Sequence, residues 1–401
     1  MSYIAGVILF ALGIALTIAL HEWGHYFAAR SFHMKVRRYF IGFGPTLFSV
    51  HRGHTEYGLK MIPLGGFCEI AGMTNQDEVT AEEAPYAMRN RPWWQRVIVM
   101  MGGIAMNLLI AVTILYGIAV SSGLPDPRAD VRATVASTGC VAEIQRADGS
   151  LSECSGLGPA GEAGIQPGDK IIAANGNPLG NFGELRQYIL DKPGKVIELS
   201  IERAGEVQDI TVQVAAARRI TTTGESVTVG AIGISSAPLD YIKRFGPIEA
   251  VSATASFTNT AVKETARGLA QFPAKIPGVV ASIFGAERAQ DGPISVVGAS
   301  RVGGELVERS LWAMFFMMLA SLNLFLAFFN LVPLPPLDGG HIIVVLYEKV
   351  RDFFRALRGL APAGPADYTK LIPVTLFFAG LLTIVGVLVI VADIVNPVRL
   401  F

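Results

Sequence analysis

The sequence predicts a polytopic α-helical membrane protein with about four transmembrane segments, a membrane-associated β-hairpin sheet on the cytoplasmic side and an extracytoplasmic α+β domain. The first observation behind this fold class is composition, because 51% of the 401 residues are hydrophobic and only 16% are charged. The second is that four apolar segments reach the roughly 20 residues that a helix needs to cross a bilayer core of about 30 Å. The third is that two stretches outside these segments alternate in polarity, as β-strands do.

The charge balance narrows the possible functions. Lys and Arg number 33, as do Asp and Glu, so the net charge is zero. Such a chain lacks the basic surface on which nucleic-acid binding depends. Its low charge and high apolar content also argue against disorder. We therefore expect a folded chain that contacts the lipid bilayer and binds no nucleic acid.

The elements are expected in the following order: a first span at residues 1–31, a cytoplasmic-side re-entrant β-sheet and loop at 32–92, a second span at 93–122, an extracytoplasmic domain at 123–218, membrane-surface helices at 219–310, a third span at 311–347, a cytoplasmic loop at 348–369, a fourth span at 370–396 and an extracytoplasmic tail at 397–401. Lys and Arg cluster in the loops 32–92 and 348–369, and basic loops face the cytoplasm. Both termini then lie outside the cytoplasm, in a multi-pass protein of the cell membrane. The prolines at 333, 335 and 336 prevent the third span from being one straight helix.

The first span carries His21-Glu22-x-x-His25 near its cytoplasmic end. Residues four apart lie on one face of a helix, so both imidazoles can bind one tetrahedral Zn²⁺ while Glu22 acts as general base, the pattern of zinc peptidases. Ionisable groups inside a span are costly and require a metal or a water-filled cavity. The alternative is the polar face of a transporter or a proton relay.

A third ligand is needed, because catalytic zinc sites usually have three protein ligands. The third span offers Asp338, within Asn330-Leu-Val-Pro-Leu-Pro-Pro-Leu-Asp338-Gly-Gly. Prolines interrupt the helix there and glycines allow close backbone approach, so an irregular stretch can bring a carboxylate to a buried site. A helix cap is the alternative role for Asp338. Beside His21 and His25, the ligand role is favoured.

These residues resemble the site-2 protease family of intramembrane zinc metalloproteases, in its RseP-type branch and closest to the actinobacterial members with a single PDZ domain. The resemblance extends to Ile62–Phe67, to a PDZ-like segment and to Pro293–Gly298, and it spans nearly the whole chain. It implies that His21, His25 and Asp338 bind zinc and that Glu22 is the general base.

The same resemblance implies how substrate is held and what it is. Asn330, Pro333 and Pro335 would contact the substrate near the metal. The substrates would be single-span membrane proteins, such as anti-sigma factors and signal-peptide remnants, cut after an upstream site-1 protease has removed the outer part. Enterobacterial members have tandem PDZ modules, whereas only one can be placed in this chain.

Two further segments suggest how substrate is selected. Residues 36–67 alternate in polarity around a turn near Arg52-Gly53, which predicts a hairpin. It could bind an unwound substrate by strand addition, or be an ordinary cytoplasmic hairpin. Residues 126–216 contain glycine-rich turns, a helix at 182–190 and strands at 196–203 and 207–214, and resemble a permuted PDZ domain. This domain either captures a peptide or excludes bulky ectodomains.

Cys140 and Cys154 lie in this outer part of the chain and are a possible disulfide, since such bonds persist outside the cytoplasm. Helical stretches at 248–269 and 275–284 are expected along the outer membrane surface. The function that these features favour together is that of a zinc-dependent intramembrane endopeptidase. The alternatives are a catalytically silent PDZ scaffold and an ion-coupled transporter.

Overall fold

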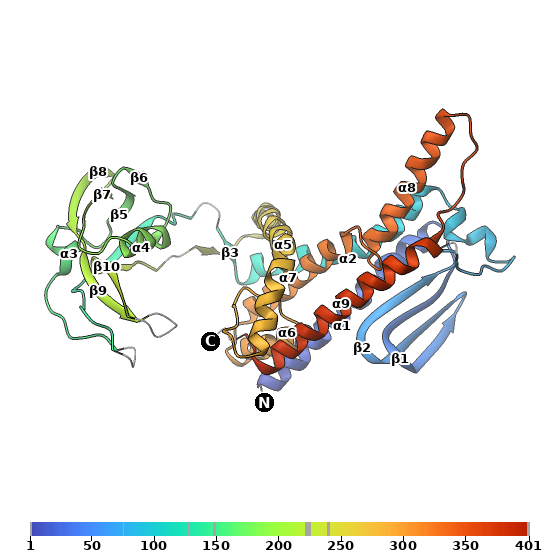
Figure 1. Ribbon diagram of the computed structural model, residues 1–401, viewed down its shortest axis with the longest axis horizontal. Coiled ribbons are helices and arrows are strands. Elements are labelled where there is room, and N and C mark those ends of the chain that lie inside the picture. The colour runs from blue at the N-terminus through green and yellow to red at the C-terminus, as the bar shows by residue number, and fades with distance from the viewer. Residues whose placement is uncertain are drawn as a thin grey trace. The chain divides into compact units, whose positions relative to one another are not determined.

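The computed structural model describes residues 2–398 apart from 75, 127–128, 147–149, 221–225 and 239–240. The chain divides into two compact units (Figure 1). The helical unit comprises Met1–Leu124 and Arg244–Phe401, and the inserted unit comprises Pro125–Lys243.

Four helical segments of the helical unit are long and apolar enough to cross a membrane, which confirms the number of spans expected from hydropathy. They are α1 (Ser2–Ser31), α2 (Trp93–Ser121), α7 (Trp312–Leu331) and the segment Tyr368–Val395, which joins η3 (Tyr368–Leu371) to α9 (Ile372–Val395). Helix α2 packs against both α1 and α7. Where α1 meets α2, a Cβ atom on Gly24 would lie 2.2 Å from the carbonyl oxygen of Gly102, so only glycine permits this approach.

The third expected span is two helices. Helix α7 ends at Leu331, the prolines occupy the turn that follows, and α8 (Asp338–Leu357) begins a new helix. Residues 348–357, which the sequence assigned to a loop, are therefore helical. Falling hydropathy marks the end of an apolar stretch but not of a helix, because an amphipathic helix continues as long as one face stays packed. A buried ion pair holds α8 to α2, since Arg96 donates to Glu348 at 2.6 Å.

The region 219–310 also differs from the expectation of surface helices alone. Its first part forms strands of the inserted unit, because short polar and apolar residues alternate there. The stretches at 248–269 and 275–284 belong to one helix, α5 (Pro247–Ile283), which contains Pro273 and Pro277. Each proline removes a single helical hydrogen bond, and packing on α2, α7 and α9 keeps α5 continuous. Helix α6 (Val296–Glu308) packs against α1.

The predicted hairpin is present as β1 (Val36–Arg52) and β2 (Thr55–Ile70), joined by the predicted turn, and is drawn in blue in Figure 1. Both strands bend, so the hairpin consists of four short strand segments that pair side by side. Residues 36–41 pair on one side with 66–70 and on the other with 56–59. The segment 66–70 is thus at an edge of the sheet. Short 3₁₀ helices η1 (Ala84–Tyr86) and η2 (Met88–Asn90) lead to α2.

The inserted unit is built on a sheet of order β11-β4-β5-β7-β8, with β6 beside β5 and a separate β9-β10 pair. Its core joins Leu185 and Ile189 of α4 to the buried face of the strands. The helix predicted at 182–190 is present, and the two predicted strands lie at 196–203 and 206–213. The unit extends to Lys243, beyond the predicted boundary at 218, because β10 and β11 complete it. Its elements, with the pair β3 and β12 at its ends, are β3 (Leu124–Pro125), β4 (Ala133–Thr138), α3 (Gly158–Glu162), β5 (Lys170–Ala174), β6 (Asn177–Pro178), α4 (Phe182–Leu190), β7 (Val196–Arg203), β8 (Glu206–Gln213), β9 (Ala215–Ile220), β10 (Ser226–Ala231), β11 (Ile234–Ser236) and β12 (Ile242–Lys243).

Candidate metal centre

The two histidines of α1 point their Nε2 atoms at the same place. His21 and His25 are one helical turn apart, and their Nε2 atoms lie 3.2 Å from each other. The Nδ1 atom of His25 is 2.8 Å from the carbonyl oxygen of Val99 on α2. Because a carbonyl only accepts, Nδ1 carries the proton, and the Nε2 lone pair of His25 is free for a metal.

The carboxylate of Asp338 reaches these histidines from the first turn of α8. Its Oδ2 atom lies 3.3 Å from Nε2 of His21 and 3.4 Å from Nε2 of His25. The preceding turn is tightly closed, since a Cβ atom on Gly339 would lie 2.4 Å from the carbonyl oxygen of Val332. The N-cap residue of α8 is Leu337 and not Asp338, and Oδ2 of Asp338 has no hydrogen-bond partner among the described residues. The capping role considered for Asp338 is therefore not supported.

The three donor atoms fit a zinc ion. The ligand atoms of His21, His25 and Asp338 form the one group of this kind found among the described residues. A tetrahedral zinc ion with bonds of about 2.0–2.1 Å requires ligand atoms about 3.3–3.4 Å apart. The observed separations of 3.2, 3.3 and 3.4 Å match all three edges. Two neutral imidazoles and a carboxylate also form a donor set typical of catalytic zinc, which leaves one position open.

The edge of the β-hairpin lies beside Glu22. A Cβ atom on Gly66 of β2 would be 3.1 Å from Cγ of Glu22, so this strand is in contact with the side chain next to the first ligand. The hydroxyl of Tyr39 on β1 donates to the carbonyl oxygen of Ala19 at 2.6 Å and so attaches the sheet to α1. A larger residue at Gly66 would press on Glu22 and require its side chain to shift by a few tenths of an ångström.

A glycine that the sequence did not single out borders the same centre. A Cβ atom on Gly103 of α2 would lie 2.3 Å from Nε2 of His25 and 2.6 Å from Nε2 of His21. Any side chain at Gly103 would therefore press on the ligand atoms themselves. Two consecutive glycines inside an apolar helix were the signal that could have drawn attention to this position.

The predicted substrate-binding residues lie in the segment that leads to Asp338. Asn330 is in the last turn of α7, and Pro333 and Pro335 are in the turn between α7 and α8. Asn330 and Pro335 are half-buried, whereas Pro333 is exposed.

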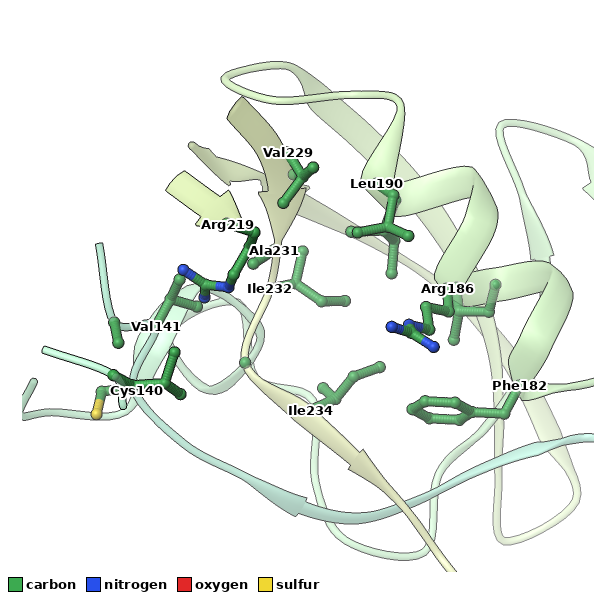
Figure 2. Close-up of a pocket in the computed structure, with 16 residues that line it drawn as sticks. Cys140, Val141, Phe182, Arg186, Leu190, Arg219, Val229, Ala231, Ile232 and Ile234 are labelled. Atoms are coloured by element: carbon green, nitrogen blue, oxygen red, sulfur yellow. The ribbon is translucent and has the colours of Figure 1, made fainter. Parts of the chain in front are cut away.

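A second candidate site lies in the inserted unit. A pocket of about 390 Å³ is bounded by α4 on one side and by the segment 229–234 on the other. Figure 2 shows the facing side chains of this pocket, which include Phe182, Arg186, Leu190, Val229, Ile232 and Ile234. The pocket is largely apolar, and Arg186 extends into it from α4 (Figure 2).

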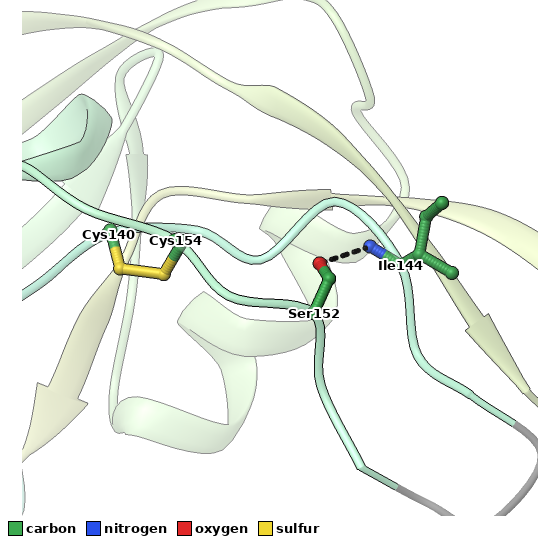
Figure 3. Close-up of a disulfide and its surroundings, with 4 residues drawn as sticks. All are labelled: Cys140, Ile144, Ser152 and Cys154. Atoms are coloured by element: carbon green, nitrogen blue, oxygen red, sulfur yellow. Dashed lines mark hydrogen bonds between the residues drawn. A yellow bond between two sulfur atoms is a disulfide. The ribbon is translucent and has the colours of Figure 1, made fainter.

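Cys140 also lines this pocket and is bonded to Cys154 (Figure 3). The Cα atoms of the two cysteines are 5.8 Å apart, which is within the usual range for a disulfide. The enclosed loop is further held by a hydrogen bond from the Ile144 amide to the Ser152 hydroxyl. The bridge thus fixes one wall of the pocket. Cys68 is the free cysteine.

Comparison with known proteins identifies the family. The sequence profile of peptidase family M50 matches residues 9–360, most of the chain. The chain belongs to peptidase family M50. This result confirms the resemblance to the site-2 proteases seen in the motifs.

Curated relatives of this M50 peptidase are similar over most or all of their length. Zinc metalloprotease Rip1 of Mycolicibacterium smegmatis is 46% identical, over 99% of this chain and 98% of the relative. Zinc metalloprotease Rip1 of Mycobacterium tuberculosis is 43% identical over 100% of both chains. Metalloprotease MmpA of Caulobacter vibrioides is 29% identical over 86% of each. Among solved structures, the PDZ domain of an SdrC-like protein from Listeria monocytogenes covers 27% of this chain and 94% of its own length, at 19% identity and a TM-score of 0.16.

Proposed function

We propose that this M50 peptidase uses His21, His25 and Asp338 to hold zinc and Glu22 to move protons, and that it cuts the membrane-spanning segments of single-span proteins. Family membership and the four apolar helices make it a zinc metalloprotease of the membrane. The observation that supports the residue assignment is the convergence of three donor atoms at the spacing that zinc requires.

In the proposed mechanism, Glu22 does the proton transfer. Zinc, when bound by His21, His25 and Asp338, supplies a Lewis acid that polarises the scissile carbonyl and favours ionisation of water. The Glu22 carboxylate takes the proton of the attacking water and delivers it to the leaving amine. The hydrogen bond from His25 to the Val99 carbonyl keeps the imidazole oriented throughout.

The substrate would have to be extended before it could be cut. A peptide in a transmembrane helix has its backbone groups paired internally, which leaves its carbonyls inaccessible. We propose that the edge segment 66–70 of β2 adds an extended substrate strand beside Glu22, and that Asn330, Pro333 and Pro335 hold the other side. The contact between Gly66 and Glu22 supports this placement.

The proposed substrates are single-span membrane proteins, including anti-sigma factors and signal-peptide remnants, after an upstream site-1 protease has acted. This proposal rests on the site-2 protease family to which the chain belongs. We propose further that the inserted unit is a PDZ domain outside the cytoplasm, that both termini share that side, and that the metal centre lies nearer the cytoplasm. The pocket beside α4 supports peptide capture rather than steric exclusion alone.

The deciding experiment compares purified wild-type protein with Glu22→Gln on a membrane-embedded reporter peptide. Glu22→Gln should keep one zinc per chain and lose at least about 10²- to 10⁴-fold in cleavage rate, the usual contribution of a general base. Glu82→Gln, at an exposed glutamate in the same half of the chain, is the matched control and should cleave normally. Undiminished turnover by Glu22→Gln would exclude Glu22 as the base. A wild-type protein that binds zinc without cleaving would favour the silent scaffold.

A further inference from the structure

The amide side chain of Asn107 lies buried in the middle of α2 without a partner. Asn107 is 1% exposed, and neither its Nδ2 nor its Oδ1 atom has a hydrogen-bond partner among the described residues. Polar groups inside a membrane normally pair with a neighbouring helix or face a functional cavity. A buried carboxamide with both ends open therefore points to a ligand.

The position of Asn107 relates it to the metal centre. Asn107 follows Gly103 by four residues, so the two lie on one face of α2, about 6 Å apart along the axis. Gly103 is the residue whose Cβ would touch Nε2 of both His21 and His25. Asn107 is thus one helical turn from the level of the zinc ligands, on the helix face that borders them.

A second polar group lies on the neighbouring helices, on the same side of the metal centre. Helices α1 and α2 are antiparallel, because Gly103 lies against His21 whereas Val99 bonds to His25. Asn107, one turn after Gly103, and Thr17, one turn before His21, therefore both lie in the same direction from the metal centre. The Thr17 side chain accepts a hydrogen bond from a residue of α7.

The residue of α7 that reaches Thr17 is Asn323. Its Nδ2 atom donates to the Thr17 hydroxyl at 3.1 Å and to the carbonyl oxygen of Leu319 at 2.8 Å. Asn323 is fully buried, yet its Oδ1 atom has no hydrogen-bond partner among the described residues. Three helices thus contribute buried polar side chains on the same side of the metal centre, Thr17, Asn107 and Asn323, which we call the polar layer. Its unpaired atoms are one amide donor and two amide acceptors.

We propose that Asn107 is a substrate-positioning residue that hydrogen-bonds the main chain of an extended substrate, with Oδ1 of Asn323 as a further acceptor. A carboxamide presents a donor and an acceptor in one plane, as a peptide group does. An extended peptide in the membrane needs such partners, whereas a helical one does not. The polar layer therefore binds the unwound form selectively, and unwinding is the step that precedes hydrolysis.

The spacing indicates which peptide group is held. An extended chain advances about 3.3 Å per residue, so 6 Å corresponds to about two residues. Asn107 should contact the peptide group about two residues from the scissile bond. This inference rests on the proposed peptidase function and extends it to a residue outside the catalytic motifs.

The test uses full-length, zinc-loaded protein in lipid nanodiscs and a synthetic single-span peptide substrate. Asn107→Leu should lower kcat/KM roughly 5- to 150-fold, the range for a lost hydrogen bond with an unsatisfied partner. Zinc content should be unchanged, and the melting temperature should be equal or higher, because no protein partner is lost. Asn107→Ser should restore part of the activity, since a hydroxyl also donates and accepts. Thr113→Val, at an exposed position of α2, is the matched control.

Substrates with single ester replacements of backbone amides identify the contact. Wild-type protein should lose activity on the ester placed about two residues from the scissile bond, and Asn107→Leu should not discriminate against it. Wild-type kcat/KM in Asn107→Leu would overturn the proposal while leaving the peptidase function intact. A lowered melting temperature with equal losses on every ester substrate, unrescued by Asn107→Ser, would overturn it in favour of a structural role. Failure of the wild-type protein to cleave at all would reject both.

Discussion

Replacing Gly103 by alanine tests the geometry of the metal centre most directly. The added methyl group would lie 2.3 Å from Nε2 of His25 and 2.6 Å from Nε2 of His21, whereas ordinary contacts begin near 3.4 Å. The overlap is thus close to 1 Å on both ligand atoms. Helix α2 cannot retreat readily, because α7 also packs against it, and His25 is held by its hydrogen bond to α2.

Overpacking of this kind typically costs about 1–3 kcal/mol, which corresponds to roughly 5- to 150-fold weaker zinc binding if the strain is relieved by releasing the metal. Zinc affinity is measured by competition with a chromophoric chelator, and cleavage is followed with the reporter peptide. Gly117→Ala, on the same helix and with nothing within 4 Å of the new methyl group, is the control and should bind zinc normally. Wild-type zinc affinity and cleavage in Gly103→Ala would refute the reasoning.

Four other outcomes follow from the structure. Asp338→Asn should weaken zinc binding by at least about 10- to 100-fold, and unchanged zinc by elemental analysis would exclude Asp338 as a ligand. Glu348→Gln leaves Arg96 of α2 buried and without its ion-pair partner, which should lower the free energy of unfolding in detergent by about 3–5 kcal/mol. A loss below about 1 kcal/mol would contradict this expectation. Hydrogen bonds from Arg37 lower the pKa of Glu83 to about 2, so Glu83→Gln should reduce the melting temperature at pH 7. The difference in melting temperature between wild type and Glu83→Gln should fade as the pH drops from about 4.3, the usual pKa of Glu, towards 2; a difference independent of pH would argue against the pair. Cys154→Ser opens a loop of about 15 residues and should destabilise the inserted unit by about 3 kcal/mol, measured by thermal unfolding of the full chain; equal stability of oxidised and reduced wild-type protein would disagree.

Several features of the site could be read from neighbouring residues alone. The histidines of α1 share a face because four residues make about one helical turn, and the break before Asp338 follows from prolines that cannot continue a helix. The hairpin turn after Arg52 was predicted from alternation and a glycine. Other features escaped the sequence. In the sequence, Gly103 and Asn107 are residues of an ordinary apolar helix, and their relation to the metal centre becomes visible only from the packing of α1 against α2.

The sequence by itself determined the number of spans, the helical spacing of His21 and His25, and the position of the hairpin, because hydropathy, helical period and turn preference act over a few neighbouring residues. Only the tertiary structure decided where α5 and α8 end and which groups of α2 face the ligands. Those outcomes depend on how helices distant in the chain pack together. Packing is set by close approach at positions such as Gly24 and Gly103, which no local pattern specifies.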